Sequence, residues 1–153
     1  VYLASEVEEK GADQLGNEIV ILGGGLVGCE TAIHLGKLGK KVTVVEMRSE
    51  AAADCNCFHK IAIGMELEKY VTVLTDTKAE NITDKGLEGL DKDANKIFVP
   101  ADAVICAAGM RSDTTVADMV QKMEIEMHVI GDAVRPNKVT QAIFDGYYIA
   151  KYL

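Results

Sequence analysis

The sequence predicts an α/β domain built on a parallel β-sheet, and three features lead to this prediction. Short β-branched runs alternate with segments of helical pattern from residue 18 onward, which is typical of parallel strands joined by helical crossovers. Three consecutive glycines, Gly23 to Gly25, follow the first of these runs and precede a helical pattern. Residues 77–100 alternate polar and apolar side chains between turn signals, which indicates an antiparallel meander in place of the third crossover helix.

The elements up to the second strand follow in order. Residues 1–17 are polar and contain glycine, so we expect a linker there. Residues 18–22 (EIVIL) are predicted to form a buried strand, because an uninterrupted apolar run suits a strand covered on both faces. Apolar side chains at helical spacing predict a helix over 27–38, which Gly39 ends as a C-terminal cap. Residues 41–46 (KVTVVE) are predicted to form the second strand.

The later elements continue the alternation of strand and helix. A second helix is expected over 56–70, with one stripe formed by Phe58, Ile61, Ala62, Met65 and Lys69. The remaining expectations are a strand over 71–75, the meander over 77–100, a buried strand over 101–109, a short strand over 128–132 and a helix over 139–152.

Composition restricts the classes of function. A chain of 153 residues with 48% hydrophobic residues can bury one substantial core. The net charge of −8 repels phosphate backbones at long range, so we expect neither a nucleic-acid partner nor an anionic membrane surface. The four cysteines form no C-x-x-C pair, so we expect reduced thiols and a cytoplasmic location. The chain starts with Val rather than Met, which suggests a piece of a longer protein.

The segment GGGLVG fits the pattern G-x-G-x-x-G at a junction of predicted strand and helix. The first glycine of such a segment makes the tight turn, the second lets a dinucleotide diphosphate approach the backbone, and the third lets the helix pack closely on the strand. The start of the helix then presents unpaired N–H groups to the anion. We therefore predict a diphosphate site formed by Gly23, Gly25, Leu26, Val27 and Gly28.

An acid about 20 residues further on completes this pattern, and Glu46 occupies that place after the second predicted strand. Its carboxylate can accept hydrogen bonds from ribose hydroxyls and would repel a 2′-phosphate, which favours NAD over NADP. Arg48, two residues on, would soften that preference. A glycine-rich turn that binds no dinucleotide, and a methyltransferase, are the alternatives for this pattern.

Several blocks together resemble a known family. GGGLVGCETA, KKVTVVE, CAAGMRSD and HVIGDA resemble the NAD-binding domain, and the return into the FAD domain, of flavoproteins with two dinucleotide-binding domains. GLVGCETAIHL, AADCN and GDAVRPNKVTQAIFDGYYIA resemble more closely the NADH:flavin oxidoreductases related to 2,4-dienoyl-CoA reductase and 2-enoate reductase. The resemblance extends over residues 18–150.

This resemblance implies a Rossmann-like, three-layer FAD/NAD(P)-binding fold, with an NAD(P)-binding domain over 18–127 and a closing segment of a FAD domain over 128–153. It implies NAD(H) as the cofactor of this part, and FAD, FMN and an iron–sulfur cluster in the rest of the parent protein. The parent would pass hydride from NADH to FAD and reduce an activated alkene. No catalytic side chain is expected within this chain, because hydride transfer needs mainly positioning.

Three further residues carry roles that the resemblance implies. Glu30 would lie near the nicotinamide, although a solvated helix acid is an equal alternative. Gly109 would line the NAD cleft, and Asp132 would bond the FAD ribitol. A non-catalytic dinucleotide-sensing module and a purely structural α/β domain are the rival functions. The segment C-N-C-F-H over 55–59 invites a metal site, but i and i+2 side chains do not share a helix face, so no metal is expected.

Overall fold

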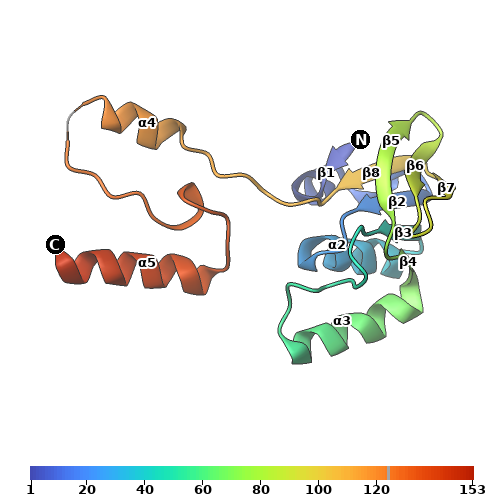
Figure 1. The fold of residues 1–153 in the computed structure, drawn as a ribbon. Helices are drawn as coiled ribbons and strands as arrows, with labels where there is room; N and C mark the ends of the chain where they lie inside the picture. The colour runs from blue at the N-terminus through green and yellow to red at the C-terminus, as the bar shows by residue number, and fades with distance from the viewer. Residues whose placement is uncertain (124) are drawn as a thin grey trace. The chain divides into compact units, whose positions relative to one another are not determined.

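The computed structural model describes residues 1–123 and 125–153. It consists of two compact units, Val1–Gly109 and Met110–Leu153, each of which is described by itself (Figure 1). The elements of the first unit are β1 (Tyr2–Leu3), η1 (Ala4–Glu6), α1 (Val7–Lys10), η2 (Ala12–Leu15), β2 (Glu18–Leu22), α2 (Leu26–Lys37), β3 (Lys41–Val45), α3 (Cys57–Tyr70), β4 (Val71–Leu74), β5 (Lys78–Thr83), β6 (Gly86–Leu90), β7 (Lys96–Pro100) and β8 (Ala103–Cys106).

A five-stranded sheet in the order β1-β8-β2-β3-β4 forms the centre of the first unit, and all its pairings are parallel. At the middle strand, Ile21 pairs with Val44 on one side and Ile105 on the other. Side chains of β2 are buried on both faces, as the uninterrupted apolar run predicts. The predicted α/β fold with a parallel sheet is therefore confirmed.

Two different layers cover the faces of this sheet. On one face, Ala32 and Leu35 of α2 pack against alternate strand residues such as Ile19 and Ile21. On the other face, Leu87 and Val99 of the meander pack against a cluster that includes Val20. The antiparallel sheet β5-β6-β7 thus takes the place of the helix between β4 and β8, which confirms the predicted crossover.

Residues 1–17 are not a linker, and the sequence-based prediction is wrong here. The two-residue strand β1 pairs in parallel with β8, so that Tyr2 lies opposite Ile105. Val7 and Leu15 are 4% and 2% exposed and belong to the core on the α2 side of the sheet. The segment is mostly polar, so its composition does not indicate that Val7 and Leu15 are buried. The strand β1 forms only by pairing with β8, about a hundred residues further along the chain.

Helix α3 occupies the predicted range but buries a different face. Asn56 caps it, since its Oδ1 accepts a hydrogen bond from the His59 N–H at 3.0 Å. Ile63 and Leu67 pack against α2, whereas the large apolar side chains of the predicted stripe are exposed to solvent. Those exposed members are Phe58, Ile61 and Met65. Because α3 carries apolar side chains all round, its periodicity alone does not select the buried face.

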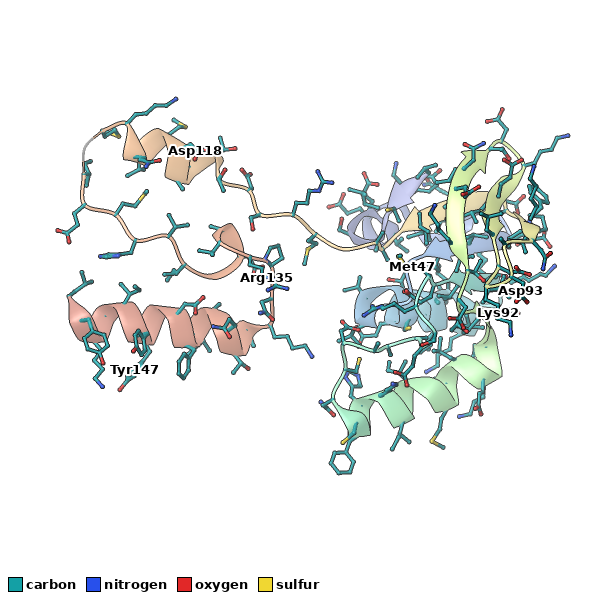
Figure 2. All side chains as sticks on the ribbon, in the orientation of Figure 1. Met47, Lys92, Asp93, Asp118, Arg135 and Tyr147 are labelled. Atoms are coloured by element: carbon teal, nitrogen blue, oxygen red, sulfur yellow. The ribbon has the colours of Figure 1, made fainter. Side chains whose placement is uncertain are left out.

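The second unit contains α4 (Thr115–Gln121), η3 (Gly131–Ala133) and α5 (Val139–Tyr152). The predicted final helix is confirmed at both ends. Ring contacts along it join Phe144 to Tyr148 and Tyr148 to Tyr152. Tyr147 is exposed on the same helix (Figure 2). The predicted strand over 128–132 does not form. A strand needs a neighbour for its ladder, and no described residue pairs with this segment.

The compact units divide after Gly109, whereas the sequence places a domain boundary between residues 127 and 128. The boundary between residues 127 and 128 stays a prediction. Within the part of the chain that the structure describes, no helix has the length and apolar character that crossing a membrane requires.

Candidate functional site

At the junction of β2 and α2 the chain's own atoms leave no space for a side chain at Gly23 or at Gly28. Gly23 has a φ of +107°, and a Cβ there would lie 2.6 Å from the Ala107 carbonyl oxygen. A Cβ on Gly28 would lie 1.9 Å from the Gly23 carbonyl oxygen. Gly23 therefore permits the tight turn, and Gly28 permits α2 to start directly against the end of β2.

The middle glycine of the pattern differs from these two. Gly25 is the N-cap of α2, with φ −69° and ψ −179°, a conformation open to any residue. A Cβ there would meet only the Asp54 carboxylate, at the ordinary contact distance of 3.7 Å. The fold itself therefore does not demand glycine at this position. A bare backbone at the start of a helix is the arrangement that lets an anion approach the first N–H groups.

Glu46 ties the glycine loop to the end of β3. Glu46 is 5% exposed, and its Oε2 accepts a hydrogen bond from the Gly24 N–H at 2.7 Å. Its Oε1 accepts from the Arg48 N–H at 2.7 Å and lies 3.4 Å from the Arg48 Nε. The buried carboxylate therefore has a backbone donor on each oxygen and a guanidinium at its open side.

A second acid, missed by the sequence analysis, lies against the same loop. The Oδ1 of Asp54 accepts a hydrogen bond at 3.0 Å from the N–H of Leu26, the first residue of α2. The neighbouring Ala52 donates its N–H to the Gly24 carbonyl at 2.7 Å, with a φ of +51°. An aspartate in a loop is ordinary, and an alanine gives no signal of left-handed backbone, so no local pattern identifies this contact.

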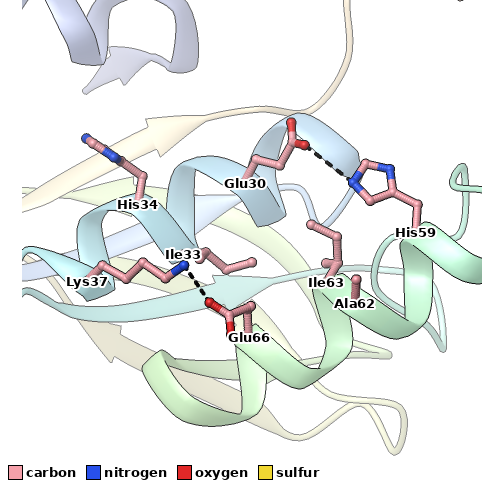
Figure 3. Close-up of a pocket in the computed structure, with 8 residues that line it drawn as sticks. All are labelled: Glu30, Ile33, His34, Lys37, His59, Ala62, Ile63 and Glu66. Carbon is pink, nitrogen blue, oxygen red and sulfur yellow. Dashed lines mark ion pairs between the residues drawn. The ribbon is translucent and has the colours of Figure 1, made fainter.

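Glu30 lies on α2 beside a shallow groove of about 350 Å³ between α2 and α3 (Figure 3). Its Oε1 is 3.7 Å from Nε2 of His59, and its side chain is half exposed. At the other end of the groove Lys37 pairs with Glu66. The groove is lined by Glu30, Ile33, His34, Lys37, His59, Ala62, Ile63 and Glu66.

The cysteines do not assemble with other ligands. Cys29 is fully buried, donates its S–H to the Gly24 carbonyl at 3.3 Å, and has its pKa raised to about 11 by burial. Cys57 is exposed and Cys55 is partly buried. Among residues 1–123 and 125–153, no three His, Cys, Asp or Glu side chains lie in a position to hold a metal ion.

The structure brings most of the predicted site residues to one edge of the sheet. Because β2, β3 and β8 are parallel, their carboxyl ends lie together, which is where open α/β sheets bind ligands. The glycine loop follows β2, Glu46 and Arg48 follow β3, and Gly109 (φ +106°) follows β8. Asp132 belongs to the separately described second unit, where its Oδ1 accepts from the Asn137 N–H at 3.2 Å.

Comparisons with known proteins place this geometry among redox proteins. Residues 3–143 match the family model described as pyridine nucleotide-disulphide oxidoreductase. The chain is 32% identical to an NADH oxidase of Thermoanaerobacter brockii over 87% of its length. It is 31% identical to a cinnamate reductase of Clostridium sporogenes over 99% of its length.

A solved structure is also similar to this chain in both fold and sequence. The complex of a 2-naphthoyl-CoA reductase with 2-naphthoyl-CoA superposes with a TM-score of 0.82 at 31% identity, over 92% of this chain. The chain spans 21% of the NADH oxidase, 23% of the cinnamate reductase and 21% of the 2-naphthoyl-CoA reductase chain. It is therefore similar to about a fifth of each of these proteins.

Proposed function

The chain belongs to the pyridine nucleotide-disulphide oxidoreductase family, and we propose that its first unit binds NAD(H) for hydride delivery to a flavin in a longer flavoprotein. The observation that carries the proposal is Gly25, the bare N-cap of α2, where the fold itself does not require glycine. The diphosphate of the dinucleotide would lie against this backbone and accept from the N–H groups of Leu26 and Val27.

Glu46 and Arg48 are proposed to contact the ribose end of the dinucleotide. The carboxylate of Glu46 lies beside the loop, so a 2′-phosphate would meet a like charge there. Arg48, whose side chain is 53% exposed, stands at the rim and reduces this repulsion. We propose NAD(H) as the preferred dinucleotide, with NADPH binding more weakly.

The nicotinamide end would extend past Glu30 and Gly109, which lie after the same turn and at the end of the adjacent strand β8. Hydride transfer moves two electrons and a proton together from the nicotinamide to its acceptor, so these residues need only position the ring and exclude water. The chain contains one G-x-G-x-x-G segment, so the flavin's diphosphate is proposed to bind elsewhere in the longer protein, with Asp132 contributing to its ribitol.

The activity of the whole protein is a further proposal. The relatives include a cinnamate reductase and a 2-naphthoyl-CoA reductase, of which the chain matches about a fifth. These names support a parent enzyme that reduces activated alkenes. A cytoplasmic location, FMN and an iron–sulfur cluster in the remaining parts are proposed from the sequence resemblance alone. The isolated chain is proposed to bind NADH without completing a reaction.

Calorimetric titration of the 153-residue chain with NADH, NADPH and FAD tests the proposal. We expect saturable binding of NADH, weaker binding of NADPH and no binding of FAD. Tight binding of FAD would contradict the assignment, because the glycine loop would then serve the flavin. Equal heats for NADH and buffer up to several millimolar would contradict a dinucleotide site in this chain.

A further inference from the structure

We propose that Asp54 is an internal competitor for the diphosphate site: in the free chain its carboxylate holds the N–H of Leu26, and it must withdraw before a dinucleotide binds. The inference rests on the proposed NAD(H) site and adds to it a residue that sets the affinity. A negatively charged side chain beside an anion site opposes ligand binding unless it moves.

The geometry of the contact carries the inference. Oδ1 of Asp54 lies 3.0 Å from the Leu26 nitrogen. The same oxygen lies 3.7 Å, and Oδ2 lies 3.9 Å, from the position of a Cβ on Gly25. The carboxylate therefore lies over the bare backbone that the diphosphate needs. One N–H group donates one strong hydrogen bond, so Leu26 cannot serve the carboxylate and a phosphate oxygen at the same time.

The backbone around Asp54 holds the carboxylate in this position. On its N-terminal side, Ala52 is 2% exposed and donates its N–H to the Gly24 carbonyl. On its C-terminal side, Cys55 packs in the apolar cluster that contains Cys29 and Ala52. The backbone on both sides of Asp54 is therefore docked beside the glycine loop, and this fixes the position of the Asp54 Cα. Asp54 itself is exposed, and withdrawal of its carboxylate would leave Ala52 and Cys55 packed in their apolar cluster.

Electrostatics makes this competition sensitive to one charge. The positive end of the α2 dipole attracts one anion into this place, and Asp54 supplies that anion when no ligand is bound. A diphosphate must displace it and then remain near both Asp54 and Glu46. Neutralising Asp54 without changing its shape removes the repulsion and leaves an amide oxygen that still accepts from Leu26. Asp54→Asn is therefore predicted to bind anions more tightly, not less.

The experiment titrates four forms of the 153-residue chain with NADH and, separately, with inorganic pyrophosphate. The forms are the unmodified chain, Asp54→Asn, Asp54→Ala and the charge-matched control Asp84→Asn. Asp84 is exposed in the turn between β5 and β6, beside Ala101 and Asp102 at the opposite end of β8 from the glycine loop. Amide hydrogen exchange at Leu26 in the free chains is the ligand-independent readout.

We expect Asp54→Asn and Asp54→Ala to bind both probes about tenfold more tightly than the unmodified chain, while Asp84→Asn changes the affinity less than twofold. Exchange at Leu26 is expected to accelerate in Asp54→Ala alone. Unchanged or weaker NADH binding in both Asp54 variants, with NADH bound by the unmodified chain, would overturn this inference and leave the NAD(H) site in place. Tighter pyrophosphate binding without any NADH binding would support the masked anion site and contradict the proposed function.

Discussion

The buried carboxylate of Glu46 accepts the Gly24 N–H at 2.7 Å, so the acid at the end of β3 fixes the loop at the end of β2. The two segments are 22 residues apart in sequence and adjacent in the sheet. In a G-x-G-x-x-G unit an acid at this place can hydrogen-bond the ribose of a dinucleotide. In this chain it also shapes the backbone that receives the diphosphate.

Replacing Glu46 with Gln is expected to weaken both the fold and the selectivity. A glutamine offers one acceptor oxygen, so either the Gly24 or the Arg48 N–H loses its partner, at a cost of about 1–3 kcal/mol in the free energy of unfolding. The ratio of NADPH to NADH affinity should rise because the repulsive charge is gone. Urea unfolding and calorimetry measure the two effects. Glu68→Gln, on the exposed side of α3, is the control and should change neither.

Gly25→Ala is expected to separate ligand binding from folding. The new methyl group contacts only Asp54 at an ordinary distance, so the free energy of unfolding should fall by no more than the roughly 1 kcal/mol that alanine costs at an N-cap. The same methyl group stands in the space proposed for the diphosphate, so NADH binding should weaken about tenfold or more. Gly64→Ala is the control for NADH binding, since a Cβ at Gly64 meets nothing within 4 Å, and it should raise the unfolding midpoint because alanine favours the interior of a helix. An alanine at position 25 that binds NADH normally would refute the proposed position of the diphosphate.

Gly28→Ala is expected to damage the fold itself. Its Cβ would lie 1.9 Å from the Gly23 carbonyl oxygen, so α2 must move away from β2. Overpacking of this kind costs about 1–3 kcal/mol or more. Thermal unfolding followed by circular dichroism should show a clearly lower midpoint than for Gly64→Ala. Equal midpoints for the two variants would mean that the junction of β2 and α2 is looser than the structure indicates.

Glu66 should contribute to stability in a defined pH range. Hydrogen bonds from Lys37 and Lys69 lower its pKa from the ordinary value of about 4.5 to about 2. The unfolded chain therefore binds this proton at higher pH than the folded chain does. The contribution is present above about pH 5 and is lost as the pH falls toward 2. Unfolding measured between pH 6 and 2 should show a shallower dependence on pH in Glu66→Gln, with Glu68→Gln unchanged from the unmodified chain.

Thiol labelling should distinguish the cysteines. Burial raises the pKa of Cys29 to about 11, so at pH 8 this thiol is protonated and inaccessible. The exposed Cys57 should react with iodoacetamide first, and Cys29 only after unfolding in urea. Mass spectrometry of the labelled peptides provides the measurement. Labelling of Cys29 at the rate of Cys57 in the folded chain would contradict the docked position of the start of α2.

The prediction of this fold from sequence succeeded where a pattern is local. The strand over 18–22, the meander and α5 follow from apolar periodicity and turn residues within a few positions of each other. The strand β1 could not be predicted, because its two residues form a strand only through β8. The face of α3 was mistaken because the helix is apolar on both sides and only its packing against α2 selects Ile63 and Leu67.

The same division applies to the candidate site. The sequence predicts that the glycines and Glu46 lie together, because their spacing along one β2–α2–β3 unit is short and regular. The contact of Asp54 with Leu26 cannot be predicted in this way, because it depends on the left-handed backbone at Ala52 and on the docking of the whole segment. Contacts between a loop and a distant helix start have no periodicity from which to predict them.

The strand order has a consequence for how the chain assembles. The first strand, β1, pairs with the last, β8, which lies between β1 and β2. During synthesis the β2-α2-β3 portion is complete and can fold well before β8 is synthesised. The backbone of β1 therefore has no hydrogen-bonding partner strand until the meander and β8 have followed. Long-range parallel pairing closes slowly because the entropy of the intervening loop is lost first. The synthesis of β8 therefore completes the sheet, and a nascent chain halted before residue 103 lacks the strand that pairs with both β1 and β2.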